Sequence, residues 1–191
     1  MQDKFKDSLG IIGFVVAVII GAIVINSFFF RTFSVIGPSM EDTLHTNDRL
    51  IVSRLQTTGA LITQNPYVPG RGTVIVFKNP LYGKGHTEEY VVKRVIGLPG
   101  ETVKVEDGSV TVYNSEHPDG FKPDNDIVGP KSPSTGSIET AVPENEIFVA
   151  GDNRHGNFSL DSRNGMGTVP LENIQGPVIL RFFPFNQIRT F

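Results

Sequence analysis

The sequence predicts a mostly β fold in which one transmembrane helix precedes an all-β body. After residue 30, short runs rich in β-branched residues alternate with turns that contain glycine or proline, a pattern typical of a β-sandwich or barrel. No long amphipathic helical pattern and no internal repeat interrupts these runs. Before residue 31, an uncharged apolar run is long enough to cross a bilayer. The 191 residues suffice for this anchor and one domain with its own core.

Composition excludes several classes of function. The chain has 17 Lys and Arg against 20 Asp and Glu, with no basic block, which argues against a nucleic-acid partner. It has no cysteine, which excludes disulfides, thiolate nucleophiles and cysteine-based metal sites. The histidines are scattered without the spacing of a metal motif: His45, His86, His117 and His155. We therefore expect no metal and no cofactor.

The apolar run extends from Leu9 to Phe30, and only Asn26 and Ser27 interrupt it. As a helix it would be about 30 Å long, which is the thickness of a bilayer core. The apolar part of a cleavable signal peptide is usually only about 7–15 residues long and leads to a small-residue cleavage site, which is missing here. A buried core helix would normally carry a polar face. The run therefore predicts a transmembrane helix, but basic residues flank both ends and barely decide its orientation.

In the body, segments expected to form strands alternate along the chain with expected turns. The predicted strands are residues 31–36, 48–55, 73–77, 88–96, 146–150 and 177–183. Residues 103–105 and 109–113 flank Glu106-Asp107-Gly108 and predict a hairpin. Residues 56–71 are expected to be a loop, 81–87 a turn, and 115–143 a loop-rich excursion dense in Pro, Gly, Ser, Asp and Asn.

These patterns predict two units. Residues 1–31 would form a short stub with a single anchor, and residues 32–191 a domain outside the membrane. Within that domain, residues 102–147 are expected to form a loop-rich β insert. A disordered linker is the alternative for part of this insert, although too little chain follows it for a second full domain.

Ser39 lies on a short stiff turn just after the predicted anchor. Pro38 fixes its own φ and pushes Gly37 towards extended geometry, so the turn is constrained immediately before the serine. No histidine is close in sequence to act as its base. A lone serine on a turn is weak evidence, because most serines are simply solvated.

Lys93 is the more informative residue, because it interrupts an apolar strand. Side chains alternate along a strand, so Lys93 shares a face with Val91 and Val95. Burial disfavours the ammonium and lowers its pKa from about 10.4; bringing it near neutrality takes roughly 4 kcal/mol. A neutral Lys93 could then take the Ser39 proton. The alternative is an edge-strand charge that prevents aggregation.

Several blocks along the chain decide between these interpretations. They are Ser39-Met40 with Thr43-Leu44, Val74–Phe77, Tyr90–Glu101, Gly151–Arg154, and Ser159-x-Asp161-Ser162-Arg163. In this order they resemble the bacterial type I signal peptidases. The resemblance covers nearly the whole chain, including the single anchor and the ending Arg181–Pro184, and is weakest over residues 115–143.

The resemblance implies a Ser-Lys dyad. Ser39 matches the nucleophile that forms the acyl-enzyme, and Lys93 matches the general base. The Ser39 N–H would be one oxyanion donor. Ser159 matches the serine that orients the lysine, but the loop before it is longer than usual, so Ser162 is the alternative. Asp161 with Arg163 and Asp152 with Arg94 match supporting ion pairs.

The resemblance also implies a substrate cleft with shallow apolar pockets that admit small side chains, as in Ala-x-Ala before the cut. Its lining residues would be Phe33, Val35, Met40, Leu44, Val91 and Val92. The sequence departs from the family pattern at several positions near the site. Gly37 supplies no oxyanion hydroxyl, Pro38 and Asp42 are unusual neighbours of Ser39, and Thr73 replaces an acidic residue.

The function expected from this resemblance is a membrane-anchored serine endopeptidase that removes signal peptides from exported preproteins. Its N-terminus would lie in the cytoplasm, with the body on the outer face of the plasma membrane. Its partners would be signal peptides, membrane lipid and the secretion translocon. The enzymatic alternatives are a peptidase dedicated to one pilin or conjugation substrate and a self-cleaving repressor relative, which the anchor disfavours. A catalytically silent membrane-tethered scaffold is the non-enzymatic alternative, but it would need neither Ser39 nor Lys93.

Overall fold

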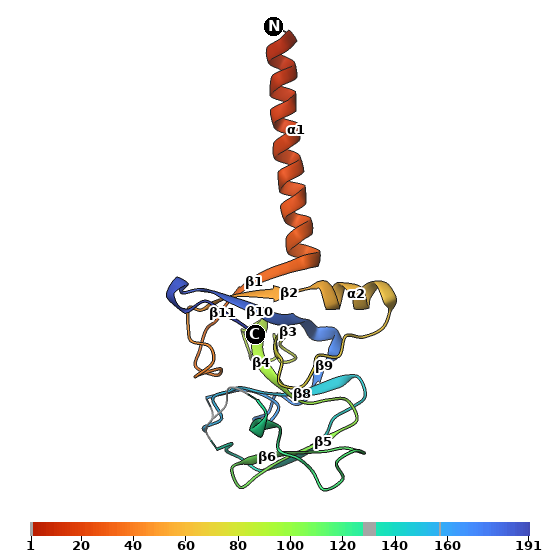
Figure 1. Ribbon diagram of the computed structural model, residues 1–191, viewed down its shortest axis with the longest axis vertical. Coiled ribbons are helices and arrows are strands. Elements are labelled where there is room, and N and C mark those ends of the chain that lie inside the picture. The colour runs from red at the N-terminus through yellow and green to blue at the C-terminus, as the bar shows by residue number, and fades with distance from the viewer. Residues whose placement is uncertain (1, 128–132, 157) are drawn as a thin grey trace.

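A long helix stands on a β body in the computed structural model, which describes residues 2–127, 133–156 and 158–191 (Figure 1). Helix α1 spans Gln2–Val24 and continues into a single π-helical turn, η1, at Ile25–Phe29. Its segment Gly10–Phe29 is 20 residues long and apolar enough to cross a membrane, and none of this segment is buried by the body. The end of the segment meets helix α2 (Leu55–Thr63), because the Arg54 N–H and the Thr58 hydroxyl donate to the Phe29 and Phe28 carbonyl oxygens. The predicted N-terminal helix and β body are therefore confirmed.

The main sheet has eight strands in the order β1-β2-β10-β3-β4-β8-β9, with β11 paired to β10. All its pairings are antiparallel. The strands are β1 (Phe30–Ser34), β2 (Arg49–Ser53), β3 (Val74–Lys78), β4 (Tyr90–Gly97), β8 (Glu146–Ala150), β9 (Val169–Pro170), β10 (Ile174–Phe183) and β11 (Arg189–Thr190). Except for the two short strands β9 and β11, they follow the strands predicted from the sequence.

Strand β10 joins the two halves of this sheet. Residues 174–177 of β10 pair with β3, whereas residues 178–183 pair with β2. The chain changes partner next to Gly176, where a side chain would collide with the Ser53 carbonyl oxygen. Because of this bend, β1 and β4, which are far apart in strand order, face the same cleft.

A smaller sheet, in the order β6-β5-β7, lies at the end of the body farthest from α1 (Figure 1). Its strands are β5 (Thr102–Glu106), β6 (Ser109–Tyr113) and β7 (Ile138–Ala141). The predicted hairpin joins β5 to β6 through Asp107 and Gly108, both with positive φ, as a two-residue turn of this kind requires. Of the predicted loop-rich stretch 115–143, residues 128–132 lie outside the described residues. The remainder contains the short helix η2 (Pro123–Asn125) and β7.

Three apolar clusters form the core. One joins β3, β4, β8 and the segment around β9; its buried residues are Ile75, Phe77, Val95, Ile147, Val149, Met166, Val169, Leu171 and Ile174. A second lies beneath β1 and β2 and contains Val35, Met40, Leu44, Leu50, Val52, Val74, Val76 and Val178. The third packs the small sheet against Ile96 of β4 and Phe148 of β8. The insert is therefore part of the packed body and not a detached linker.

One element contradicts the sequence-based expectation. Residues 56–71 were expected to form a loop, but Leu55–Thr63 form the helix α2. Thr57 Oγ1 bonds the carbonyl oxygens of Arg54 and Gln175, and Thr58 Oγ1 bonds that of Phe28. The hydrogen bonds to Gln175 and Phe28, which are distant in sequence, offset the poor helix propensity of the threonines and Gly59. Gln64 ends the helix in a left-handed conformation (φ 56°). Short helices η3 (Leu171–Asn173) and η4 (Phe185–Gln187) complete the chain.

Candidate active site

Ser39 and Lys93 meet, although 53 residues of sequence lie between them. The Lys93 Nζ and Ser39 Oγ atoms are 2.6 Å apart, within hydrogen-bond distance. Lys93 lies on β4 opposite Ile75 of β3 and is only 2% exposed. Ser39 is half-buried on the turn that follows β1. A serine hydroxyl that a substrate can reach thus touches an amine that water scarcely reaches.

Burial lowers the pKa of the Lys93 ammonium to about 8. Two carboxylates, Asp161 and Asp152, oppose this by favouring the charged form, while the Arg163 guanidinium acts with burial. A pKa near 8 leaves an appreciable fraction of the amine neutral at neutral pH, which a general base requires. The strand alternation predicted for β4 holds as well, since Val91 and Val95 pack in the same apolar cluster.

Core packing holds the turn that carries Ser39 in place. Met40 and Leu44 are fully buried in the cluster beneath β1 and β2. The Glu41 N–H donates to the Pro38 carbonyl oxygen, and the Thr43 and Leu44 N–H groups donate to that of Met40. Packing on one side and these turns on the other hold the Ser39 backbone in place.

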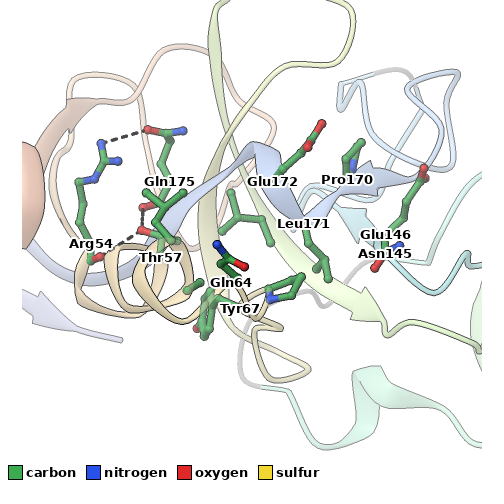
Figure 2. Close-up of a pocket in the computed structure, with 14 residues that line it drawn as sticks. Arg54, Thr57, Gln64, Tyr67, Asn145, Glu146, Pro170, Leu171, Glu172 and Gln175 are labelled. Atoms are coloured by element: carbon green, nitrogen blue, oxygen red, sulfur yellow. Dashed lines mark hydrogen bonds between the residues drawn. The ribbon is translucent and has the colours of Figure 1, made fainter.

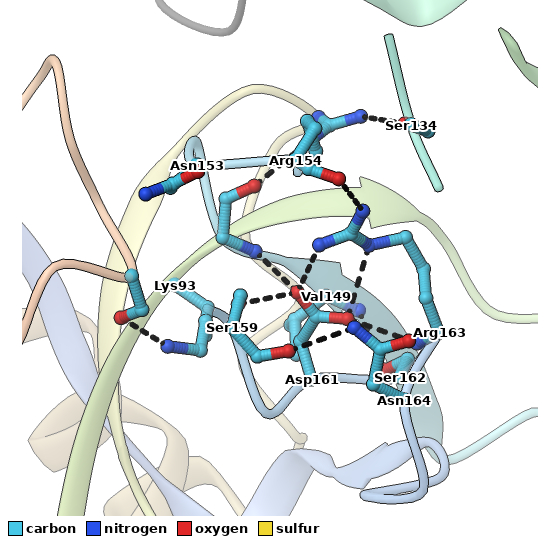
Figure 3. Close-up of polar contacts among 12 residues, drawn as sticks. Lys93, Ser134, Val149, Asn153, Arg154, Ser159, Asp161, Ser162, Arg163 and Asn164 are labelled. Carbon is cyan, nitrogen blue, oxygen red and sulfur yellow. Dashed lines mark hydrogen bonds and ion pairs between the residues drawn. The ribbon is translucent and has the colours of Figure 1, made fainter. Parts of the chain in front are cut away.

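Asp161 is the centre of a buried polar cluster next to Lys93 (Figure 3). Its Oδ2 accepts hydrogen bonds from the Gly151 N–H (2.8 Å), Ser159 Oγ (2.5 Å) and Arg163 Nη2 (2.7 Å). Its Oδ1 accepts from the Arg163 N–H and Nε, both at 3.0 Å. These donors satisfy both oxygens of the buried carboxylate, which offsets the cost of removing it from water.

A second buried ion pair lies on the other face of β4. Arg94 binds Asp152 through Nε (2.8 Å) and Nη2 (2.5 Å), and its Nη1 donates to the Gly72 carbonyl oxygen. The Thr43 hydroxyl donates to the same carboxylate at 2.5 Å. Asp152 thus ties the strand of the lysine to the turn of the serine.

Ser159 and Ser162 do not bond Lys93 in the structure. Ser159 Oγ donates to Asp161, and Ser162 Oγ accepts the Val149 N–H at 3.0 Å. A buried hydroxyl finds a stronger acceptor in a carboxylate than in an amine, which accounts for the choice of Ser159. The Ser159–Lys93 hydrogen bond expected from the sequence is absent among the described residues. Asp161 acts on Lys93 through its charge.

A cleft of about 510 Å³ opens beside Ser39, between β1 and the start of β4. Four of the six predicted cleft residues line it, namely Phe33, Val35, Val91 and Val92. Met40 and Leu44 do not, since both are fully buried in the core beneath. Sequence reasoning missed other lining residues: Ser34, Ile36, Leu50, Val76, Thr87, Glu88, Glu89 and Tyr90.

The Gly151–Arg154 block contains two residues near Ser39, Gly151 and Asn153, for which the sequence predicted no role. The Asn153 N–H donates to the Ser39 carbonyl oxygen at 3.1 Å, and Asn153 Nδ2 donates to that of Pro38 at 3.2 Å. A side chain at Gly151 would collide with the Ser159 hydroxyl and the Ser39 carbonyl oxygen. Gly151 and Asn153 lie on either side of Asp152, a predicted supporting residue. This adjacency is the feature of the sequence that could have indicated their importance.

A larger hollow, of about 770 Å³, lies between α2 and the strands β8 to β10. Figure 2 shows Arg54 and Thr57 at one side of it and Glu146 and Glu172 at the other. Neither Ser39 nor Lys93 lines it, so we place the chemistry in the smaller cleft. Within the described part of the chain, no group of three or more His, Asp or Glu side chains is arranged to hold a metal ion.

A serine hydroxyl in contact with a buried, partly neutral amine beside a cleft is the arrangement that a Ser-Lys hydrolase requires. The chain belongs to the family described as signal peptidase, peptidase S26, whose model matches residues 8–183. Signal peptidase I of Bacillus licheniformis is 33% identical over 92% of this chain and 88% of its own length. Signal peptidase I of Bacillus amyloliquefaciens is 34% identical over 98% and 96%. A crystal structure of a signal peptidase I from Enterococcus faecalis shares 28% identity over 57% of this chain and 95% of its own, with a TM-score of 0.42.

Proposed function

We propose that this protein is a membrane-anchored serine endopeptidase that removes N-terminal signal peptides from exported preproteins. The observation that carries the proposal is the 2.6 Å contact between Ser39 Oγ and the buried Lys93 Nζ. Membership of the signal peptidase family supplies the substrate class. A catalytically silent scaffold is disfavoured, because burying a lysine against a serine has a cost that a scaffold has no reason to bear.

The first half of the reaction is acylation. Neutral Lys93 takes the proton of the Ser39 hydroxyl as Oγ attacks the carbonyl carbon of the scissile peptide. Negative charge develops on the carbonyl oxygen, and the Ser39 N–H would stabilise it. The Lys93 ammonium then returns a proton to the departing amine, which leaves the signal peptide as an ester on Ser39.

The second half is deacylation by water. The leaving amine has carried away the proton, so Lys93 is neutral again and can activate a water molecule against the ester. Collapse of the second tetrahedral intermediate frees the signal peptide and restores the Ser39 hydroxyl. One base therefore serves both halves, and no metal or cofactor takes part in the scheme.

The supporting residues keep this base and nucleophile in register. Asp161, Arg163 and Ser159 form the buried cluster beside Lys93. Burial lowers the pKa of Lys93, the Asp161 carboxylate raises it, and the Arg163 guanidinium lowers it further. Asp152 with Arg94 joins β4 to the Ser39 turn. We assign these residues positioning and electrostatic roles.

The substrate would lie in the cleft as an extended segment beside β1. β1 is an edge strand of the main sheet. Val35 directs its N–H and carbonyl oxygen towards the chain at 47–48. Successive residues of a strand direct these groups to opposite sides, so those of Ser34 face away from β2 and are available to an added strand. Phe33, Val35, Val91 and Val92 would provide shallow apolar pockets for small side chains before the cut.

The membrane arrangement follows from the reaction. Cleavage sites of exported preproteins emerge on the outer face, so α1 would cross the bilayer with the N-terminus in the cytoplasm. Residues 1–31 would be the stub and anchor, and residues 32–191, with the insert 102–147, the peptidase domain. Sharing one membrane with the substrate raises the effective concentration of both. Contacts with membrane lipid and with the translocon belong to this proposal.

Processing of a preprotein tests the proposal. Full-length Ser39→Ala and Lys93→Ala variants should each lose cleavage of a preprotein by at least about 10³-fold, as when a residue of a catalytic unit is removed. Circular dichroism and thermal unfolding should show an intact fold in both. Thr111→Ala, in the small sheet far from the cleft, is the matched control and should cleave normally. Normal processing by either dyad variant would disprove the dyad.

A further inference from the structure

Asn153 makes two hydrogen bonds to the backbone on either side of the nucleophile. Its N–H donates to the Ser39 carbonyl oxygen at 3.1 Å, and its side-chain Nδ2 donates to the Pro38 carbonyl oxygen at 3.2 Å. A carbonyl oxygen can only accept, so the amide nitrogen of Asn153 must be the atom that faces Pro38. The side chain is therefore a donor here and acts on the peptide group that precedes the nucleophile.

That peptide group carries the Ser39 N–H. The Pro38–Ser39 bond is trans, and in a trans peptide the carbonyl and the N–H point in opposite directions within one plane. Holding the Pro38 oxygen towards Asn153 therefore aims the Ser39 N–H away from Asn153. Among the described residues, this N–H has no hydrogen-bond partner, so it is free to receive a developing oxyanion.

Asn153 itself is held rigidly by its two neighbours. On one side, Asp152 is bound by Arg94 and Thr43. On the other, Arg154 is fully buried, and its guanidinium binds Asp124 at 2.7 and 2.8 Å and Ser134 Oγ at 3.1 Å. Arg154 Nε also donates to the Gly151 carbonyl oxygen at 2.7 Å. Through Arg154, the insert between β6 and β7 braces the loop that holds Asn153.

We propose that Asn153 is a positioning residue that fixes the plane of the Pro38–Ser39 peptide and so aims the Ser39 N–H at the oxyanion. This rests on the proposed function. The local turn bond from the Glu41 N–H to the same Pro38 oxygen remains without Asn153, but it ties the peptide only to its own turn. The Asn153 amide joins that peptide to the rigid loop 151–154. Because Gly37 has no side-chain hydroxyl to offer, a well-aimed backbone donor matters more here.

The test is steady-state cleavage of a signal-peptide substrate by full-length Asn153→Ala and Asn153→Asp. Losing an oxyanion donor outright costs roughly 10²–10³-fold in kcat, so losing only its brace should lower kcat about tenfold. KM should change less than about twofold, because a misaimed oxyanion donor weakens the transition state and not ground-state binding. Asn153→Asp keeps the size but cannot donate, so its kcat should fall at least as far as that of Asn153→Ala, both measured on the alkaline plateau.

Two further measurements separate positioning from loosening of the fold. The apparent pKa of kcat/KM in Asn153→Ala should stay where it is in the wild type, because Asn153 touches the backbone beside Ser39 and not Lys93. Asn114→Ala, in the insert, removes a comparable side-chain amide hydrogen bond to Glu101 and should leave kcat unchanged. A kcat within twofold of wild type for either Asn153 variant, or a loss expressed only in KM or in a displaced pKa, would overturn this inference. If the wild type itself cleaves no signal peptide, the proposed function fails instead.

Discussion

Two opposing effects act on the pKa of Lys93. Burial drives its pKa down, while Asp161 and Asp152 pull it back up, and burial prevails. The apolar strand around Lys93 could be predicted from sequence, because alternation alone placed it on a face with Val91 and Val95. Its contact with Ser39 could be inferred only through family resemblance. The role of Asn153 could not, since a neutral side chain that bonds a distant carbonyl leaves no periodic or charge signal in the sequence.

The pH dependence of cleavage follows from the pKa of Lys93. Only the neutral amine accepts the Ser39 proton, so kcat/KM should rise as pH increases towards the pKa of about 8 and level off above it. A fluorogenic signal-peptide substrate measured from pH 5 to 10 gives the profile. A flat profile across this range would identify a different base.

The lowered pKa of Lys93 also predicts that this residue reduces the stability of the folded protein at neutral pH. The folded-state pKa of Lys93 lies below its ordinary value of 10.5, so between about pH 8 and 10.5 the unfolded chain binds more protons and stability rises with pH. Lys93→Met, which lacks the base, should therefore have a larger free energy of unfolding than the wild type at pH 7, by at most about 3 kcal/mol. Denaturant titration measures this difference as a higher unfolding midpoint. That difference should shrink as pH is raised from 8 to 10.5. A Lys93→Met variant less stable than wild type at pH 7 would show that the lysine is not strained by burial.

At the scale of elements, the strands could be predicted because their apolar alternation reflects a buried face. Helix α2 could not, because its threonines and Gly59 disfavour a helix and its supports are hydrogen bonds to residues distant in sequence. The residues that line the cleft were predicted only in part, because the tertiary structure decides which of them face it. Met40 and Leu44 resemble lining residues in sequence, but the turn after β1 directs them into the core.

The free edge of β1 should bind substrate through the backbone of Ser34. Ser34→Pro removes an N–H that faces away from β2, and proline is tolerated on an edge strand, so the fold should survive. We expect KM to rise about tenfold, since at least one backbone hydrogen bond to the substrate is lost (about 1.4 kcal/mol). Ser34→Ala keeps the N–H and is the matched control, with kinetics close to wild type. An unchanged KM in Ser34→Pro would rule out pairing at this residue.

At the scale of the whole molecule, α1 would anchor the protein, and the body holds the cleft and the nucleophile. None of the segment Gly10–Phe29 is buried by the body, and the chain passes directly from this segment into β1, which is one wall of the cleft. The nucleophile follows only a few residues later in sequence. This connection would hold the cleft near the membrane surface, where a substrate that is itself anchored by its apolar segment must present its cleavage site.

The absence of cysteine makes the orientation directly measurable. Single-cysteine variants Asp3→Cys and Glu116→Cys place one thiol on each side of the predicted anchor, and Glu116 is exposed. A membrane-impermeant maleimide applied to intact cells should label Glu116→Cys and spare Asp3→Cys until the cells are lysed. The opposite pattern would place the body in the cytoplasm and contradict the proposed topology.

If Ser39 becomes acylated with Lys93 as its base, the acyl-enzyme can be detected by its mass during turnover. A signal-peptide ester that acylates faster than it deacylates is mixed with the full-length enzyme, quenched with acid and digested for mass spectrometry. We expect an acyl group on the peptide that contains Ser39, formed faster as pH rises towards 8 and missing in Lys93→Ala. An acyl group on another residue, or equal acylation of Ser39 in Lys93→Ala, would contradict this expectation.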